Sequence, residues 1–286
     1  MSNASQLGLV STRTEADGSR VLLVGGFQLV EGEAQVALAE GSQRLLALLA
    51  LRGRPVKRLL VAGTLWPDVT ERRAYASLRS ALTRLYGVVR DAVEVNPGDL
   101  RLASSVAVDL RESQALAHRL LDVADQPLDA SDLSGGAIAA LSGELLPDWY
   151  DDWVLLEAED WRQLRLHALE ALSGLLTAAG RYGDAAAAAL AAVKADPLRE
   201  SAHAALIQVH LAERNQSEAL REFRRYQELL RAELDIEPTA HLRRLIDPPE
   251  GSRPPRCRRR HAPVTLASRH RDGRALNLPI RPSRSG

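Results

Sequence analysis

A repeat in the second half of the chain constrains its fold more than any other feature. Small and apolar residues recur there 34 residues apart. Four pairs show the period: Leu172 and Leu206, Ala185 and Ala219, Ala189 and Phe223, Ala192 and Tyr226. A unit of this length is typical of two antiparallel helices that bury their apolar faces only by stacking on the next unit. The sequence therefore predicts a stack of helices in this half.

The residues between the repeats point to one kind of helix pair. Gly180-Arg181-Tyr182, Ala185 and Pro197 fit the turn and packing positions of the tetratricopeptide repeat. The second copy is weaker, because Arg214 stands where the first copy has Gly180. We expect an all-α, tetratricopeptide-like domain over residues 106–247, with the segment Trp149–Trp161 packed at its start. Its breaks are expected at Gly135-Gly136, Pro147, Gly180, Pro197 and Pro238.

Residues 20–105 have a different pattern, in which short strands and three helices precede a hairpin. The predicted elements are two strands around a turn at Glu31–Glu33, helices over 42–52, 56–66 and 72–88, and a hairpin over 93–103. Ser42 is expected to cap the first helix, and Gly53 to end it. This order predicts a winged helix-turn-helix.

The helix at 72–88 has the clearest two-sided pattern. Leu78, Leu82 and Leu85 form an apolar face. The other side carries Arg72, Arg73, Arg79, Ser80, Thr83 and Arg84. A helix fits the major groove of DNA, where such side chains reach base edges and phosphates, so we interpret this face as DNA-binding. The alternative is a solvated helix face.

The hairpin is interpreted as the wing of this domain. Arg101 is the residue expected to contact DNA from it. The alternative is a hairpin that only closes a sheet.

Longer runs in both halves resemble one family. GGFQLVEG, SQRLLALLALRGRPV, LLVAGTLWPD and ASLRSALTRLYG resemble the effector domain of response-regulator transcription factors. LLPDWYDDWVLLE and the run from DPLRESAHAAL to RAELDIEP resemble the bacterial transcriptional activation domain. In this order they are similar to the Streptomyces antibiotic regulatory protein family, over about residues 20–247.

The resemblance carries functional expectations. It places Arg79, Ser80, Thr83 and Arg84 on the family's recognition helix, and it puts Tyr86 where the family often has a basic residue. It implies a homodimer on double-stranded promoter DNA and contact with RNA polymerase holoenzyme. In similar domains, the connection at Pro67–Glu71 makes that contact. It also implies regulation of a secondary-metabolite gene cluster, as in antibiotic biosynthesis.

Charge is segregated along the chain although the total is zero. Residues 20–105 hold 12 basic and 8 acidic side chains, whereas residues 106–247 hold 14 and 25. A basic module before an acidic one predicts different partners, DNA for the first and protein for the second. The ends are expected to be disordered, as a polar leader at 1–19 and a tail at 248–286 with ten arginines and seven prolines.

Signals for catalysis, metals and membranes are weak. The sequence has no G-x-x-x-x-G-K-[ST] motif and one cysteine, Cys257. His203 and His210 stand seven residues apart, unlike the spacing of four usual for helical metal pairs. We predict no enzyme, no cofactor and no metal. The aspartates around Trp149 and Trp153 are expected to cap a helix. Without a signal peptide or a long apolar stretch, we expect a cytoplasmic protein that does not bind membranes.

Together these features predict a mainly α protein with a small β component, a winged helix-turn-helix followed by an all-α domain. Its expected function is sequence-specific transcriptional regulation, as an activator. The alternative is a tetratricopeptide-type adaptor for protein interactions with little DNA binding, and salt-dependent binding to DNA distinguishes the two.

Overall fold

The computed structural model describes residues 18–86, 89, 91–122 and 127–247. The leader up to residue 17 and the tail from residue 248 lie outside the described residues. The strands are β1 (Ser19–Leu22), β2 (Gln28–Glu31), β3 (Ala34–Val36), β4 (Val56–Lys57), β5 (Val93–Val95), β6 (Asp99–Leu102) and β7 (Ala107–Val108). The helices are α1 (Glu40–Arg52), α2 (Arg58–Leu65), α3 (Glu71–Tyr86), α4 (Asp109–Leu121), α5 (Gly135–Ser142), α6 (Asp152–Ala178), α7 (Tyr182–Ala195), α8 (Glu200–Ala212), α9 (Gln216–Leu234) and α10 (Ala240–Ile246). The protein is therefore mainly α with a small β component, as predicted.

Two small sheets frame the first three helices. One has the strand order β3-β2-β1-β7, in which β1 pairs antiparallel with β2 and parallel with β7. The other has the order β4-β6-β5 and is antiparallel. The predicted turn at Glu31–Glu33 joins β2 and β3, but the run before it holds two strands rather than one. Gly25 and Gly26, with φ of 85° and 130°, let the chain reverse direction between β1 and β2.

The starts of two predicted helices were wrong. Residues 56–57 form β4, because Val56 pairs with Leu100 across the second sheet, and α2 begins only at Arg58. Ser42 does not cap α1, which begins at Glu40. Its buried hydroxyl donates instead to the carbonyl of Ala81 at 2.9 Å, and this bond ties α1 to α3.

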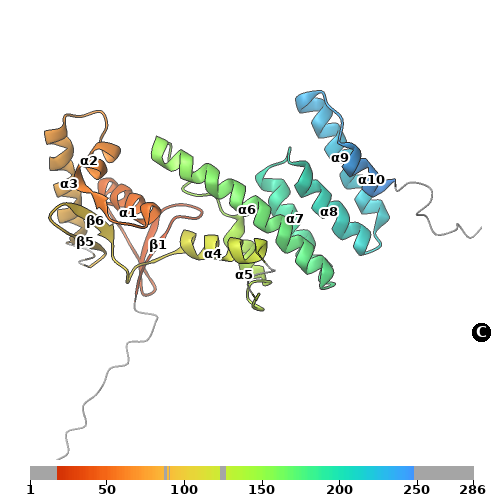
Figure 1. Cartoon of the computed structure of the whole chain (residues 1–286), viewed down its shortest axis with the longest axis horizontal. Helices are drawn as coiled ribbons and strands as arrows, with labels where there is room; N and C mark the ends of the chain where they lie inside the picture. The colour runs from red at the N-terminus through yellow and green to blue at the C-terminus, as the bar shows by residue number, and fades with distance from the viewer. Residues whose placement is uncertain (1–17, 87–88, 90, 123–126, 248–286) are drawn as a thin grey trace, which may run out of the picture. The chain divides into compact units, whose positions relative to one another are not determined.

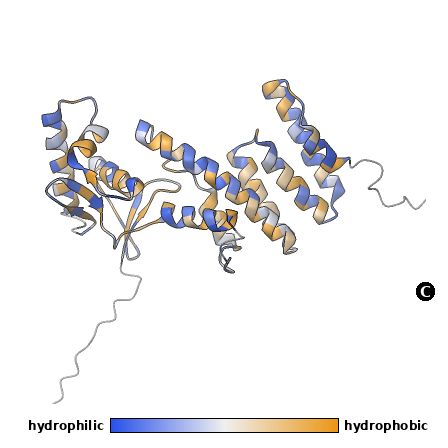
Figure 2. Cartoon of the chain, in the orientation of Figure 1, coloured by the Kyte–Doolittle hydropathy of each residue, from blue (hydrophilic) through white to orange (hydrophobic). Residues whose placement is uncertain are grey.

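Helices α6 to α9 follow one another as a stack in which each packs on its predecessor (Figure 1). Hydrophobic and hydrophilic residues are both distributed along this stack (Figure 2). The repeat extends to the turns. Gly180 and Arg214 each follow the end of a helix and have a left-handed backbone conformation, with φ of 73° and 66°. In both, the backbone N–H donates to the carbonyl three residues back at 3.0 Å. Arg214 thus adopts the conformation of the glycine it replaces, at a cost of about 1–2 kcal/mol for a residue with a Cβ.

Two polar residues of the helical domain, His203 and Asp151, take their partners from other helices. His203 lies in the core, where it contacts Glu222 and Tyr226. Asp151 precedes α6, but its side chain makes no capping bond. It forms an ion pair with Arg44 of α1 instead, so the predicted helix cap is in fact a link to the N-terminal helices.

Backbone hydrogen bonds between residues far apart in sequence join the helical domain to the β1–β2 connection of the first sheet. The N–H of Gly25 donates to the carbonyl of Glu144 at 2.7 Å, and the N–H of Leu146 donates to the carbonyl of Leu23 at 3.0 Å. The carboxylate of Asp109, at the start of α4, accepts from the N–H of Leu23 at 2.8 Å. One continuous hydrophobic core runs through both parts, from the first sheet into α8.

Gly143 sits where this junction leaves no room for a side chain. A Cβ built on Gly143 would overlap Cγ1 of Val24, whereas a Cβ on Gly174 in α6 would meet nothing within 4 Å. We expect Gly143→Ala to lower the free energy of unfolding by about 1–3 kcal/mol through overpacking. The matched change Gly174→Ala should raise it by about 0.5–1 kcal/mol, because alanine favours a helix interior. Urea unfolding of both variants measures this, and an unchanged stability of Gly143→Ala would show that the junction is loose.

Candidate nucleic-acid interface

The candidate interface is the solvent face of α3. This helix packs on α1 and α2 through one apolar face. The buried residues are Ala74, Leu78, Ala81, Leu82 and Leu85. Because an α-helix turns 100° per residue, burying these positions leaves the opposite face free.

All six residues predicted on this helix are exposed there: Arg72, Arg73, Arg79, Ser80, Thr83 and Arg84. They form two rows, because residues three, four and seven apart lie on one side of a helix. One row holds Arg72, Arg79 and Thr83, and the other holds the remaining three. The hydroxyl of Thr83 donates to the carbonyl of Arg79 at 2.9 Å, so Thr83 offers its oxygen as an acceptor.

The four arginines of this face share one electrostatic feature. Within the described ranges, none of their guanidinium groups forms an ion pair or a hydrogen bond. Elsewhere in the chain arginines are commonly paired, as Arg119 is with Asp132 and Arg162 with Glu159. Unpaired guanidinium groups keep their full charge and all their donors for an external acceptor, such as a phosphate or a guanine edge.

Arg101 behaves differently from the α3 arginines. Its Nε and Nη2 donate to the carboxylate of Glu94 at 2.7 and 3.0 Å, across the β5–β6 hairpin. Hydrogen bonding to Arg101 lowers the pKa of Glu94, and the same bond raises the pKa of Arg101. β6 packs against β4, β5 and α1, so the structure does not bring Arg101 together with the six residues of α3.

Arg58 is a cation of this region that the sequence interpretation missed. It begins α2 and lines a cavity of about 360 Å³ together with Arg72, Tyr75 and Arg79 of α3. Its backbone N–H donates to the carbonyl of Gly98 at 3.1 Å, and its buried Nε has no hydrogen-bond partner among the described residues. No local signal marks Arg58, because periodicity shows which face of a helix is polar but not which helices meet.

The connection between α2 and α3 runs over residues 66–70 and presents a partly exposed Val69 to solvent. In the described part of the chain, no group of three or more His, Cys, Asp or Glu side chains could hold a metal ion. None of the described helices has the length and apolarity needed to cross a membrane.

Comparison with known proteins gives a family match and a structural match. Residues 108–247 match the bacterial transcriptional activator domain family. No curated protein matches the chain. The structure of Mycobacterium tuberculosis EmbR, in complex with a low-affinity phosphopeptide, is similar with a TM-score of 0.60 and 25% sequence identity. The match covers 80% of this chain and 64% of the EmbR chain.

The fold and the matches define a class. The chain has small sheets and three helices, one with an exposed polar face, followed by a bacterial transcriptional activator domain over residues 108–247. More narrowly, the domain match and the EmbR-like fold support a transcriptional regulator of the Streptomyces antibiotic regulatory protein type.

Proposed function

We propose that the chain binds specific double-stranded promoter DNA through α3 and activates transcription there. The observation that supports this most directly is the set of four exposed, unpaired arginines on a helix whose apolar face is fully used in packing. In this proposal Arg72, Arg73, Arg79, Ser80, Thr83 and Arg84 contact DNA, with Arg58 added as a phosphate-binding residue. Arg101 joins them from the wing only if it leaves Glu94, since the ion pair cancels its charge.

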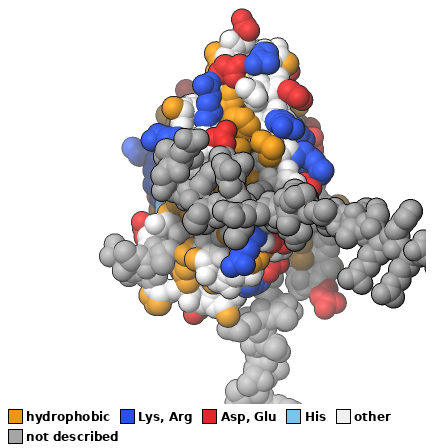
Figure 3. Space-filling model, turned by 90° about the vertical axis from the view of Figure 1, so that its right-hand side faces the viewer, with side chains coloured by type: hydrophobic (Ala, Val, Ile, Leu, Met, Phe, Trp, Pro, Cys, Tyr) orange, Lys and Arg blue, Asp and Glu red, His pale blue; other side chains and the backbone are white. Residues whose placement is uncertain are grey.

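The two parts of the chain then have separate roles. Residues 20–105 read DNA, and residues 106–247 contact proteins, namely RNA polymerase holoenzyme and a second copy of the chain on repeated sites. The charge supports this division, because 25 acidic against 14 basic side chains in the second part repel phosphates. The end of the helical stack also exposes hydrophobic side chains between charged ones (Figure 3), and Leu234 and Ile236 of that region are each 51% exposed.

The regulated genes are proposed from the family resemblance to be a secondary-metabolite cluster. Acting on chromosomal DNA places the protein in the cytoplasm. Both statements depend on the DNA-binding role.

Selection of duplexes from a random pool by the purified full-length chain tests the function. We expect enrichment of one short motif, with an affinity that falls as salt rises because phosphate contacts release counterions. Binding of selected and scrambled duplexes with equal affinity would reject sequence-specific recognition. No measurable binding at low salt would instead favour the adaptor for protein interactions.

A further inference from the structure

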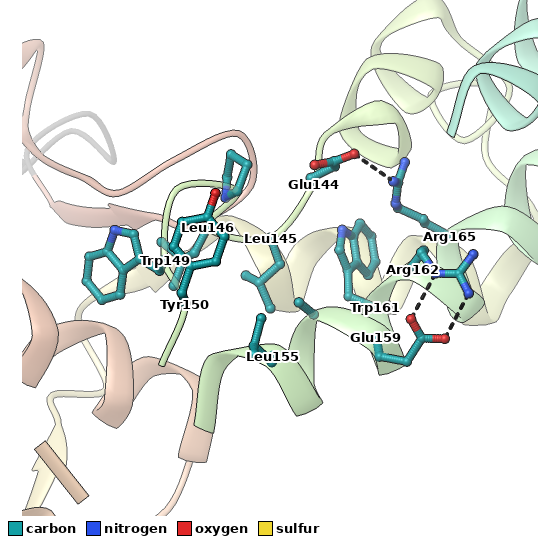
Figure 4. Close-up of a pocket in the computed structure, with 12 residues that line it drawn as sticks. Glu144, Leu145, Leu146, Trp149, Tyr150, Leu155, Glu159, Trp161, Arg162 and Arg165 are labelled. Atoms are coloured by element: carbon teal, nitrogen blue, oxygen red, sulfur yellow. Dashed lines mark hydrogen bonds and ion pairs between the residues drawn. The ribbon is translucent and has the colours of Figure 1, made fainter. Parts of the chain in front are cut away.

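A pocket in the helical domain carries an inference that does not depend on the DNA-binding proposal. Its volume is about 280 Å³, close to the roughly 300 Å³ at which small-molecule sites begin. We call it the aromatic pocket. It is lined by Glu144, Leu145, Leu146, Pro147, Trp149, Tyr150, Leu155, Ala158, Glu159, Trp161, Arg162 and Arg165. Figure 4 shows Trp149 and Tyr150 at one end of the pocket, and Trp161 at the other end beside Arg162 and Arg165.

The apolar wall of the aromatic pocket is rigid except at its edge. Trp161 is buried, and its Nε1 donates to the carbonyl of Gly143 at 3.0 Å. Trp149 stacks on Phe27 of the N-terminal part, with ring centroids 5.9 Å apart. Tyr150 is 81% exposed and lies at the edge. The lining beside Trp161 is apolar and already in place, which reduces the ordering cost of binding a flat apolar ligand.

The charged side of the aromatic pocket contains an arginine with an incomplete set of partners. Arg165 is 2% exposed, and its Nη1 donates to the carbonyl of Ser142 at 3.2 Å. Its Nε has no partner among the described residues, and its Nη2 lies 3.8 Å from Glu144, beyond hydrogen-bond distance. Burial lowers the pKa of Arg165, and the Glu144 carboxylate 3.8 Å away only partly opposes this effect.

Other arginines of the chain show what this edge of the guanidinium normally binds. In Arg101 and in Arg119, Nε and Nη2 together donate to one carboxylate, with all four distances between 2.7 and 3.1 Å. The corresponding edge of Arg165 has only Glu144 near it, whose side chain is 65% exposed. A buried guanidinium gains most from a bidentate carboxylate, because the pair satisfies two donors and the charge at once.

From these features we infer that the aromatic pocket binds a small carboxylic acid with an aromatic or flat apolar body. The ring lies in the apolar part of the pocket beside Trp161, and the carboxylate takes the Nε–Nη2 edge of Arg165. Glu144 is then a competitor, since its carboxylate must move away from the guanidinium. Arg162 contributes little to the ligand, because it already pairs with Glu159 and Asp196.

The position of the aromatic pocket would let a bound ligand affect the N-terminal part of the chain. Its wall segment 144–146 is the one that pairs with Leu23 and Gly25 of the first sheet. Movement of Glu144 would therefore act on a segment that the first sheet also holds.

Calorimetric titration of the full-length chain with 1-naphthylacetate and with 1-naphthylacetamide tests the inference. The two probes share the ring and differ in the carboxylate. We expect the acid to bind at least ten times more tightly than the amide. Equal affinity of the two probes, or no binding of the acid at millimolar concentration, would overturn the inference.

Substitutions locate the site. Glu144→Gln removes the competing charge and should tighten binding of the acid at least threefold, whereas Glu213→Gln, at an exposed position on α8's end, should leave it unchanged. Arg165→Gln should weaken it at least tenfold in a variant whose melting curve shows a folded state. If Arg165→Gln does not fold, the Glu144→Gln result decides. Unchanged or weaker binding by Glu144→Gln would refute the proposed site.

Discussion

Replacing Arg79 and Arg84 together by alanine is expected to weaken binding to the selected duplex about 30-fold or more, because each arginine in contact with a base contributes about 1–3 kcal/mol. The two side chains lie in different rows of α3, so the double change affects both sides of the candidate interface. The fold should survive, since both residues are exposed and neither guanidinium has a partner among the described residues. Gel-shift titration and a thermal melt of the same preparation measure the two quantities.

A control with the same change in charge separates recognition from general electrostatics. Arg224 and Arg225 are exposed on α9 in the helical domain. Their double alanine variant should bind the selected duplex as the wild type does. If it loses as much affinity as the α3 variant, the helical domain also contacts DNA. If neither variant loses affinity, α3 is not the recognition helix.

His203→Ala is expected to destabilise the protein by about 3–5 kcal/mol, because it leaves the buried carboxylate of Glu222 without its hydrogen-bond partner. The ring is 1% exposed, and both nitrogens face oxygen acceptors, Glu222 Oε1 at 2.7 Å and the carbonyl of Pro197 at 2.9 Å. The ring also stacks on Tyr226, with centroids 4.2 Å apart. For a domain of this size, the melting temperature should fall by about 6–20 °C.

A double variant shows whether the stability lost in His203→Ala comes from the Glu222 carboxylate that is left without a partner. His203→Phe with Glu222→Leu keeps much of the volume and the stacking, so it should recover most of the stability lost in His203→Ala. A double variant as unstable as the single one would mean that packing, not the buried charge, sets the cost.

The pH dependence of the same pair has a definite sign. Hydrogen bonding to His203 lowers the pKa of Glu222 below its ordinary value of 4.5. The stability that Glu222 contributes is therefore complete above pH 4.5 and is lost as the pH falls through the lowered pKa of the folded state. Urea unfolding below pH 4.5 should show a steeper loss in the wild type than in the double variant. Parallel pH profiles would show that the pair does not titrate with folding.

Features that depend on neighbours along the chain could be predicted from the amino-acid sequence. The 34-residue period predicted the helical stack, and the structure repeats it even in the turns at Gly180 and Arg214. The spacing of Leu78, Leu82 and Leu85 predicted which face of α3 is buried. These features are local and periodic, because the pitch of a helix relates side chains three, four and seven residues apart whatever packs on them.

Contacts between residues that are distant in sequence could be found only in the folded chain. Ser42 was expected at a helix cap and binds the carbonyl of Ala81 instead, and Arg101, which was expected to contact DNA, is paired with Glu94. The aromatic pocket depends on the pairing of Glu144 with Gly25, more than a hundred residues away. The physical reason is the same in each case. A polar group takes the partner that the folded chain brings within hydrogen-bond distance, and sequence periodicity carries no record of such encounters.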